Sequence, residues 1–149
     1  MMSQDTNKSS SSGRPKGIVT IEFVLVISVL TALGFGLVEF AQFFSVKNML
    51  EGAAREGARN AISSAASNST VTSTVQNVIA CYSYPANTTS VAITDLSGNA
   101  VDVSTAPFGT KIKVTVSATW GTIGAGSRPL GLINSAKTVM GSAVMVKEK

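Results

Sequence analysis

The feature that most constrains the fold is an apolar run near the N-terminus. Residues 18–38, IVTIEFVLVISVLTALGFGLV, contain a single charged side chain, that of Glu22. In an α-helix rising about 1.5 Å per residue, such a run is about 31 Å long, which matches the hydrocarbon core of a bilayer. The run is longer than a signal-peptide core, and no A-x-A-type cleavage site follows it, so we expect it to be retained. The sequence therefore predicts a transmembrane helix, to which we assign residues 18–40.

The flanks of this run predict its orientation and the domain organisation. Residues 1–17 are polar and rich in serine, which predicts a disordered basic leader. Arg14 and Lys16 directly precede the apolar run, whereas the basic residues after it are farther away and mixed with acidic ones. Because positive charge favours the cytoplasmic side, we expect a single-pass protein of the cytoplasmic (inner) membrane with its N-terminus in the cytoplasm. Residues 41–149 would then form one extracytoplasmic (periplasmic) domain.

Composition argues against several classes of function. The formal net charge is +4, but the basic residues form no face interleaved with aromatic ones, so we expect no nucleic-acid partner. The chain has no histidine, and its one cysteine, Cys81, rules out an internal disulfide. Most hydrolase and metalloenzyme designs are thereby disfavoured, and Asp95 and Asp102 flank a predicted turn, where aspartates usually bind backbone amides. We expect no catalytic residue, no metal and no cofactor.

Helical periodicity continues from residue 39 to about residue 66 as two stripes with a four-residue spacing. The charged stripe is Lys47, Glu51, Arg55 and Arg59, and the small-residue stripe is Ala53, Gly57, Ala61 and Ala65. The two stripes are offset by two residues and face roughly opposite ways. We expect the charged stripe to be solvated, with ion pairs between the first three residues. The small stripe suits close packing against either the protein's own sheet or a partner helix, and the sequence leaves both open.

The remaining sequence predicts one short helix and several strands. Residues 70–80 show helical spacing, with Ser69 or Thr70 as the cap, and residues 111–120 alternate strictly between apolar and polar. Weaker strand patterns cover residues 90–94, 100–104 and 138–146, with a turn at 96–100, and the glycine-rich stretch 121–131 is expected to be a connecting loop. The predicted fold is α+β and pilin-like: a long N-terminal helix, half transmembrane and half amphipathic, packed on a small antiparallel sheet.

Glu22 is the most informative single residue. A carboxylate near the edge of a membrane span costs about 2 kcal/mol or more unless it is paired. If the chain were cut after Gly17, Ile18 would start the mature protein with a free ammonium group four residues before Glu22, on the same helix face. The same pairing could form between neighbouring subunits. Alternatively, the chain stays uncut and Glu22 reaches the cytoplasmic headgroups beside Lys16.

Three segments resemble known families. The segment RPKG at 14–17, followed by IVTIEF at 18–23, resembles type IV prepilins, which have a glycine followed five residues later by a glutamate. The segments FGLVEF at 35–40 and AAREGAR at 53–59 resemble the TadE family of pseudopilins from the tight-adherence secretion system. The motif residues are Glu39, Phe40, Ala54, Arg55, Glu56, Gly57, Ala58 and Arg59. The resemblance extends more loosely through residues 111–120 and 138–148.

The resemblance implies a pilus-assembly role without chemistry of its own. A prepilin peptidase would cut between Gly17 and Ile18, and Glu22 with Phe23 would serve recognition or assembly. The expected role is in biogenesis of adhesive Flp-type pili, with other pilin or pseudopilin subunits, tight-adherence components and the lipid bilayer as partners. A second hypothesis is an uncleaved, signal-anchored extracytoplasmic binding module. An enzyme is the weakest hypothesis.

Overall fold

The computed structural model describes residues 16–123 and 129–148 of the chain. Most of the predicted leader, residues 1–15, and the middle of the predicted loop 121–131 lie outside the described residues. The chain divides into two compact units between Gly34 and Phe35. We describe each unit by itself and call the second one, from Phe35 onward, the head.

The first unit is the N-terminal part of helix α1, which as a whole spans Lys16–Ala61. Every described side chain from Val19 to Gly34 is exposed, although most of them are apolar. The hydroxyl groups of Ser28 and Thr31 donate to backbone carbonyls one turn earlier in the same helix, each at 2.7 Å. Such internal pairing satisfies hydroxyls where the surroundings offer no partner. Within the described residues, α1 is the one helix long and apolar enough to cross a membrane.

Helix α1 ends at Ala61, earlier than the predicted residue 66. Backbone N–H groups of the following serine-rich segment close turns instead, from Ser63 to the carbonyl of Asn60 and from Ala66 to that of Ser63. Helix α2 then spans Asn68–Cys81, which confirms the predicted short helix.

The cap of α2 is Ser67, not the predicted Ser69 or Thr70. Its hydroxyl accepts from the N–H of Thr70, whose own hydroxyl accepts from the Ser67 N–H at 2.9 Å, so the two residues form a capping box. The cap lies earlier than predicted because Thr70 fills the third position of that box and not the cap itself.

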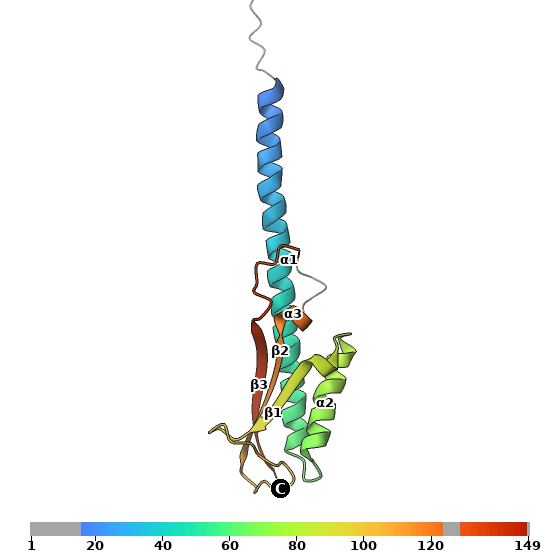
Figure 1. The fold of residues 1–149 in the computed structure, drawn as a ribbon. Coiled ribbons are helices and arrows are strands. Elements are labelled where there is room, and N and C mark those ends of the chain that lie inside the picture. Colours follow the sequence, from blue (N-terminus) through green and yellow to red (C-terminus); the bar gives the residue numbers. More distant parts are fainter. Residues whose placement is uncertain (1–15, 124–128, 149) are drawn as a thin grey trace, which may run out of the picture. The chain divides into compact units, whose positions relative to one another are not determined.

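The sheet has three antiparallel strands in the order β1-β2-β3 (Figure 1). The strands are β1 (Thr89–Thr94), β2 (Lys111–Thr119) and β3 (Thr138–Val146), and a 3-10 turn, η1 (Ala86–Thr88), precedes β1. The strongest predicted strand and two of the weaker ones are therefore confirmed. Trp120 was expected to end β2, but it begins the short helix α3 (Trp120–Ile123) and is nevertheless fully buried.

The predicted strand at residues 100–104 is wrong. Only a single bridge, between Thr94 and Ala100, follows the turn at 95–98. Side chains take the backbone donors that a strand would use: Asn68 accepts from the N–H of Val103, and Asp102 from that of Ser104, both at 2.9 Å. The segment is therefore held as a turn against α2.

The core lies between the sheet and the C-terminal half of α1, with α2 alongside (Figure 1). Gly141 in β3 permits the closest contact between helix and sheet. A Cβ atom at Gly141 would collide with the backbone of Leu50 and lie 2.7 Å from the Cα of Glu51. The predicted α+β architecture, a long N-terminal helix on a small antiparallel sheet, is thus confirmed.

Candidate functional site

The predicted cleavage and assembly residues lie in the first turns of α1. Gly17 and Ile18 belong to the helical backbone, and the side chains of Glu22 and Phe23 are exposed, Phe23 by 63%. Ile18 and Glu22 are four residues apart in a continuous helix, so they share one helix face. This is the spacing that an ammonium group on Ile18 would need in order to reach Glu22.

The segment at 53–59 divides into two sets of residues with different environments. Ala54, Gly57 and Ala58 are buried, whereas Arg55, Glu56 and Arg59 are exposed. Ala53, Gly57 and Ala61 of the small-residue stripe are also buried, so the stripe packs against the sheet and α2 of the same chain. Only Ala65 of that stripe is exposed, because it follows the end of α1.

Gly57 is the point at which α1, α2 and β2 come closest. A Cβ atom there would lie 2.6 Å from Cγ2 of Val75 in α2 and 3.3 Å from Cγ1 of Val114 in β2. Any larger side chain would push the two helices apart. The glycine of the AAREGAR segment therefore has a packing role.

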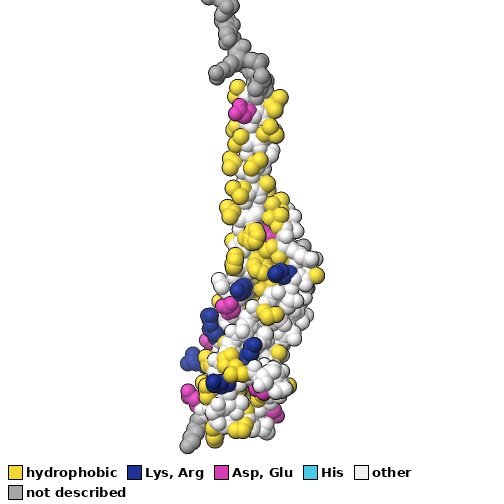
Figure 2. Space-filling model, turned by 90° about the vertical axis from the view of Figure 1, so that its left-hand side faces the viewer, with side chains coloured by type: hydrophobic (Ala, Val, Ile, Leu, Met, Phe, Trp, Pro, Cys, Tyr) yellow, Lys and Arg dark blue, Asp and Glu magenta, His cyan; other side chains and the backbone are white. Residues whose placement is uncertain are grey.

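The charged stripe is solvated and paired as expected. Glu51 Oε1 lies 3.9 Å from Lys47 Nζ, and its Oε2 lies 3.4 Å from Arg55 Nη2. Exposed pairs of this kind each contribute about 0.2–1 kcal/mol. Figure 2 shows acidic and basic side chains side by side on one face of the head.

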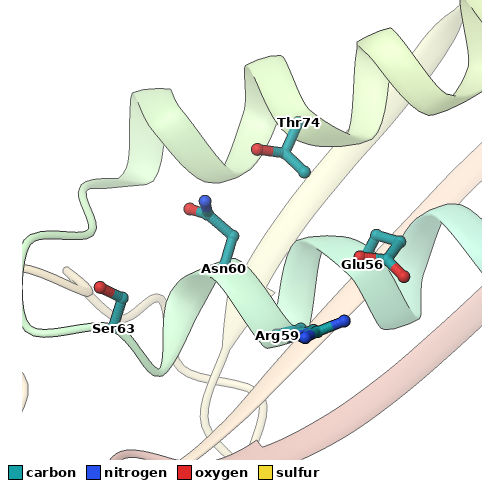
Figure 3. A pocket seen from close by; sticks show the side chains of 5 residues that line it. All are labelled: Glu56, Arg59, Asn60, Ser63 and Thr74. Atoms are coloured by element: carbon teal, nitrogen blue, oxygen red, sulfur yellow. The ribbon is translucent and has the colours of Figure 1, made fainter.

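An open polar groove lies between α1 and α2. Its volume is about 310 Å³, and it is lined by Glu56, Arg59, Asn60, Ser63 and Thr74. Figure 3 shows Asn60 reaching from α1 toward α2, where Thr74 lies. The buried Oδ1 atom of Asn60 has no hydrogen-bond partner among the described residues. Residues 16–123 and 129–148 contain no group of His, Cys, Asp or Glu side chains that could hold a metal ion.

Glu39 has a structural partner that sequence reasoning missed. Its side chain is fully buried, and Oε1 accepts a 2.9 Å hydrogen bond from the backbone N–H of Ile133. Ile133 lies in the loop between α3 and β3. The one signal in the sequence was an acidic residue placed directly after the apolar run, and nothing local indicates which segment it binds.

The comparisons with known proteins concern the N-terminal part of the chain. The family model described as TadE-like protein matches residues 17–59. The matched segment contains Gly17, Glu22, Glu39 and the whole AAREGAR stretch. Neither the curated proteins nor the solved structures give a match.

Proposed function

We propose that this chain, whose residues 17–59 match the TadE-like family, is a pseudopilin or minor pilin-like protein that assists biogenesis of Flp-type adhesive pili. The family match carries the proposal, because it covers the apolar helix together with both TadE-like segments. TadE-like proteins are associated with tight-adherence pilus systems and are in general not enzymes. We therefore assign the chain no reaction of its own.

In this proposal, the N-terminal part of α1 anchors the protein in the cytoplasmic membrane. The exposed apolar side chains from Val19 to Gly34 support an anchor, since a free helix with this surface would be poorly soluble in water. The basic residues Arg14 and Lys16 favour a cytoplasmic N-terminus and an extracytoplasmic head.

Cleavage after Gly17 by a prepilin peptidase would couple maturation to assembly. It would create an ammonium group on Ile18, one helical turn from the exposed Glu22. Inside a bilayer, an unpaired carboxylate is expensive, so Glu22 would pair with that ammonium group or with the one on a neighbouring subunit. Partners of this stage would be other pilin or pseudopilin subunits and tight-adherence components.

Gly17→Ala tests the cleavage step. In cells with a complete tight-adherence system, we expect the variant to accumulate as the full-length precursor, measured by intact mass in the membrane fraction. The matched control is Gly34→Ala, because Gly34 lies in the same helix and a Cβ there meets nothing within 4 Å. Normal maturation of Gly17→Ala would overturn the proposed cleavage.

Glu22→Gln separates assembly from cleavage. We expect this variant to be processed but to lose co-purification with other pilin-like subunits, since the new ammonium group would lack its counter-charge. Glu51→Gln removes a carboxylate of the same helix from the solvated stripe and serves as the control. If Glu22→Gln co-purifies with other pilin-like subunits as well as the wild type does, Glu22 does not contribute to the assembly contact.

The open groove at Asn60 supports a second candidate function, an uncleaved and membrane-anchored binding module. A polar groove with an unpaired buried oxygen suits a hydrogen-bonding ligand. Mass spectrometry of the wild-type protein distinguishes the two functions. A mature chain beginning at Ile18 favours the pseudopilin, and an N-terminus at Met1 or Met2 favours the binding module.

A further inference from the structure

We propose that the loop Leu130–Ile133 and the adjoining face of α1 form a second membrane contact, which seats the head in the phospholipid interface. This inference rests on the membrane anchor of the proposed function. It concerns where the head lies with respect to the bilayer, which the anchor alone leaves free. The occupant of this surface would be phospholipid, with acyl chains on its apolar side chains and a headgroup phosphate at Lys137.

The loop packs on α1 within the first turns of the head. Residues 18–34, which precede the head, would span only about 25 Å as a helix, less than the roughly 30 Å of a hydrocarbon core. A complete span therefore needs about one further turn of α1, which belongs to the head. Leu132 packs on that turn, since a Cβ atom at Gly36 would lie 3.4 Å from its Cδ1. Leu132 therefore packs on the turn of α1 at which a 30 Å span that begins at Ile18 would be completed.

Large apolar side chains are exposed on this part of α1 and on the loop. The large side chains from α1 and the loop that are 43–65% exposed in the head are Phe35, Leu37, Val38, Phe40, Phe44, Leu130 and Leu132. Figure 2 shows a cluster of hydrophobic side chains in the upper part of the head, with basic side chains beside it. Phe40, Phe44 and Leu132 line one groove, and a continuous exposed apolar surface of this kind marks contact with a membrane or another protein. Phenylalanine and leucine suit the acyl boundary of a bilayer.

The loop backbone has a hydrogen-bond partner in α1. Irregular backbone is tolerated at membrane depth only when its polar groups have partners in the protein. The buried carboxylate of Glu39 accepts a hydrogen bond from Ile133 N–H at 2.9 Å. This bond gives the loop backbone a partner inside the protein, and the exposed side chains of Leu130 and Leu132 are left free to face lipid.

Lys137 supplies the polar edge of this surface. It is exposed and lines an apolar groove of about 430 Å³ together with Phe40, Phe44 and Leu132. Its backbone is fixed, because the Lys137 carbonyl accepts from Trp120 N–H at 2.8 Å. A cation beside an apolar groove matches an anionic phospholipid, whose phosphate and acyl chain it would hold together.

Site-specific labelling of the full chain in lipid nanodiscs tests the proposal. In a Cys81→Ser background, an environment-sensitive fluorophore is placed through Leu132→Cys, and in a second variant through Leu130→Cys. The matched control is Leu96→Cys, because Leu96 and Leu132 are both leucines that are 58% exposed. Leu30→Cys, within the apolar helix, reports on the anchor itself. Circular dichroism verifies that each labelled protein is folded.

The expected result is a blue-shifted emission at positions 130 and 132, with loss of intensity when the lipids carry a quencher near the headgroup. Position 96 should show neither effect. If position 30 is quenched by lipids that carry the quencher on the acyl chain but 130 and 132 behave like 96, the loop proposal is overturned and the anchor stands. If position 30 is also unquenched by the acyl-chain quencher, the anchor fails and the loop proposal fails with it. Blue-shifted emission at 132 without lipid quenching would mean that protein covers the loop, which also overturns the proposal.

Lys137→Gln tests the headgroup contact. Quenching at position 132 should be stronger in nanodiscs of mixed phosphatidylglycerol and phosphatidylcholine than in phosphatidylcholine alone, and Lys137→Gln should remove this difference. Lys111→Gln, an exposed lysine at the start of β2, is the control and should keep the difference. Equal quenching in both lipids with wild-type Lys137 would overturn the phosphate assignment.

Discussion

The carboxylate of Glu39 in α1 accepts a 2.9 Å hydrogen bond from the backbone N–H of Ile133, a residue 94 positions later in the chain. This single bond ties the loop before β3 to the helix that begins in the apolar run. Oε2 of the same carboxylate is buried without a hydrogen-bond partner among the described residues. Glu39 therefore holds a chain segment in place through one oxygen.

Glu39→Ala should destabilise the head more than Glu39→Gln does. Glutamine keeps an acceptor oxygen for Ile133, whereas alanine leaves the half-buried N–H of Ile133 without its acceptor. We expect the thermal midpoint to be highest in the wild type, lower in Glu39→Gln and lowest in Glu39→Ala, as measured by circular dichroism in detergent. Equal midpoints for the Ala and Gln variants would show that the acceptor is dispensable.

Gly141→Ala should destabilise the head by about 1–3 kcal/mol or more, the usual range for overpacking a filled core. The new methyl group would collide with the backbone of Leu50, and backbone cannot rotate away as a side chain can. The check is urea unfolding followed by the fluorescence of the single tryptophan, Trp120. Ser142→Ala, the exposed neighbour in β3, should change stability little.

Lys147→Met should destabilise the head by about 1–3 kcal/mol, the cost of leaving buried acceptors unpaired. Lys147 is buried, and its Nζ donates to the carbonyls of Val103 at 2.7 Å and Ser63 at 3.3 Å, which joins two turns to the end of β3. Lys111→Met, at an exposed position, is the matched control. If both variants unfold at the same urea concentration, these bonds contribute nothing measurable.

Acid should weaken the turn at Asp102. Hydrogen bonds from the Ser104 hydroxyl and then from its backbone N–H, with a smaller contribution from the charge of Lys147, hold the pKa of Asp102 below its ordinary value of 3.8. A lowered pKa stabilises the fold above the ordinary value, and this stabilisation is lost as pH falls through the lowered one. We expect the thermal midpoint to decrease as the pH is lowered below about 4. In the Asp102→Asn variant this decrease should be less steep.

Asp95 must be controlled for in that experiment. Hydrogen bonds from the side chain and then the backbone N–H of Asn99 lower the pKa of Asp95 as well, so it titrates in the same pH range with the same sign. In the double variant Asp95→Asn, Asp102→Asn, the decrease of the thermal midpoint at low pH (the acid limb) should therefore be smaller still. An unchanged limb in both variants would mean that neither turn loses stability on protonation.

Local patterns predicted those parts of the structure that local physics controls. The alternation at Lys111–Thr119 specifies a strand with one buried face, and the apolar run specifies a helix, because both periodicities are properties of neighbouring residues. The same holds for the ion pairs of Glu51, which join residues one helical turn apart. The error at residues 100–104 arose because Asn68, far away in sequence, takes the N–H of Val103.

The sequence by itself determined the apolar helix, the Gly17–Glu22 spacing and the family resemblance of residues 17–59, since each depends only on which residues follow one another. Only the tertiary structure decided that the small-residue stripe packs on the chain's own sheet, with Gly57 against Val75 and Val114. It also gave Glu39 its partner, Ile133. Both contacts join segments far apart in the chain, and no local spacing specifies which distant backbone will fill a gap or supply a hydrogen bond.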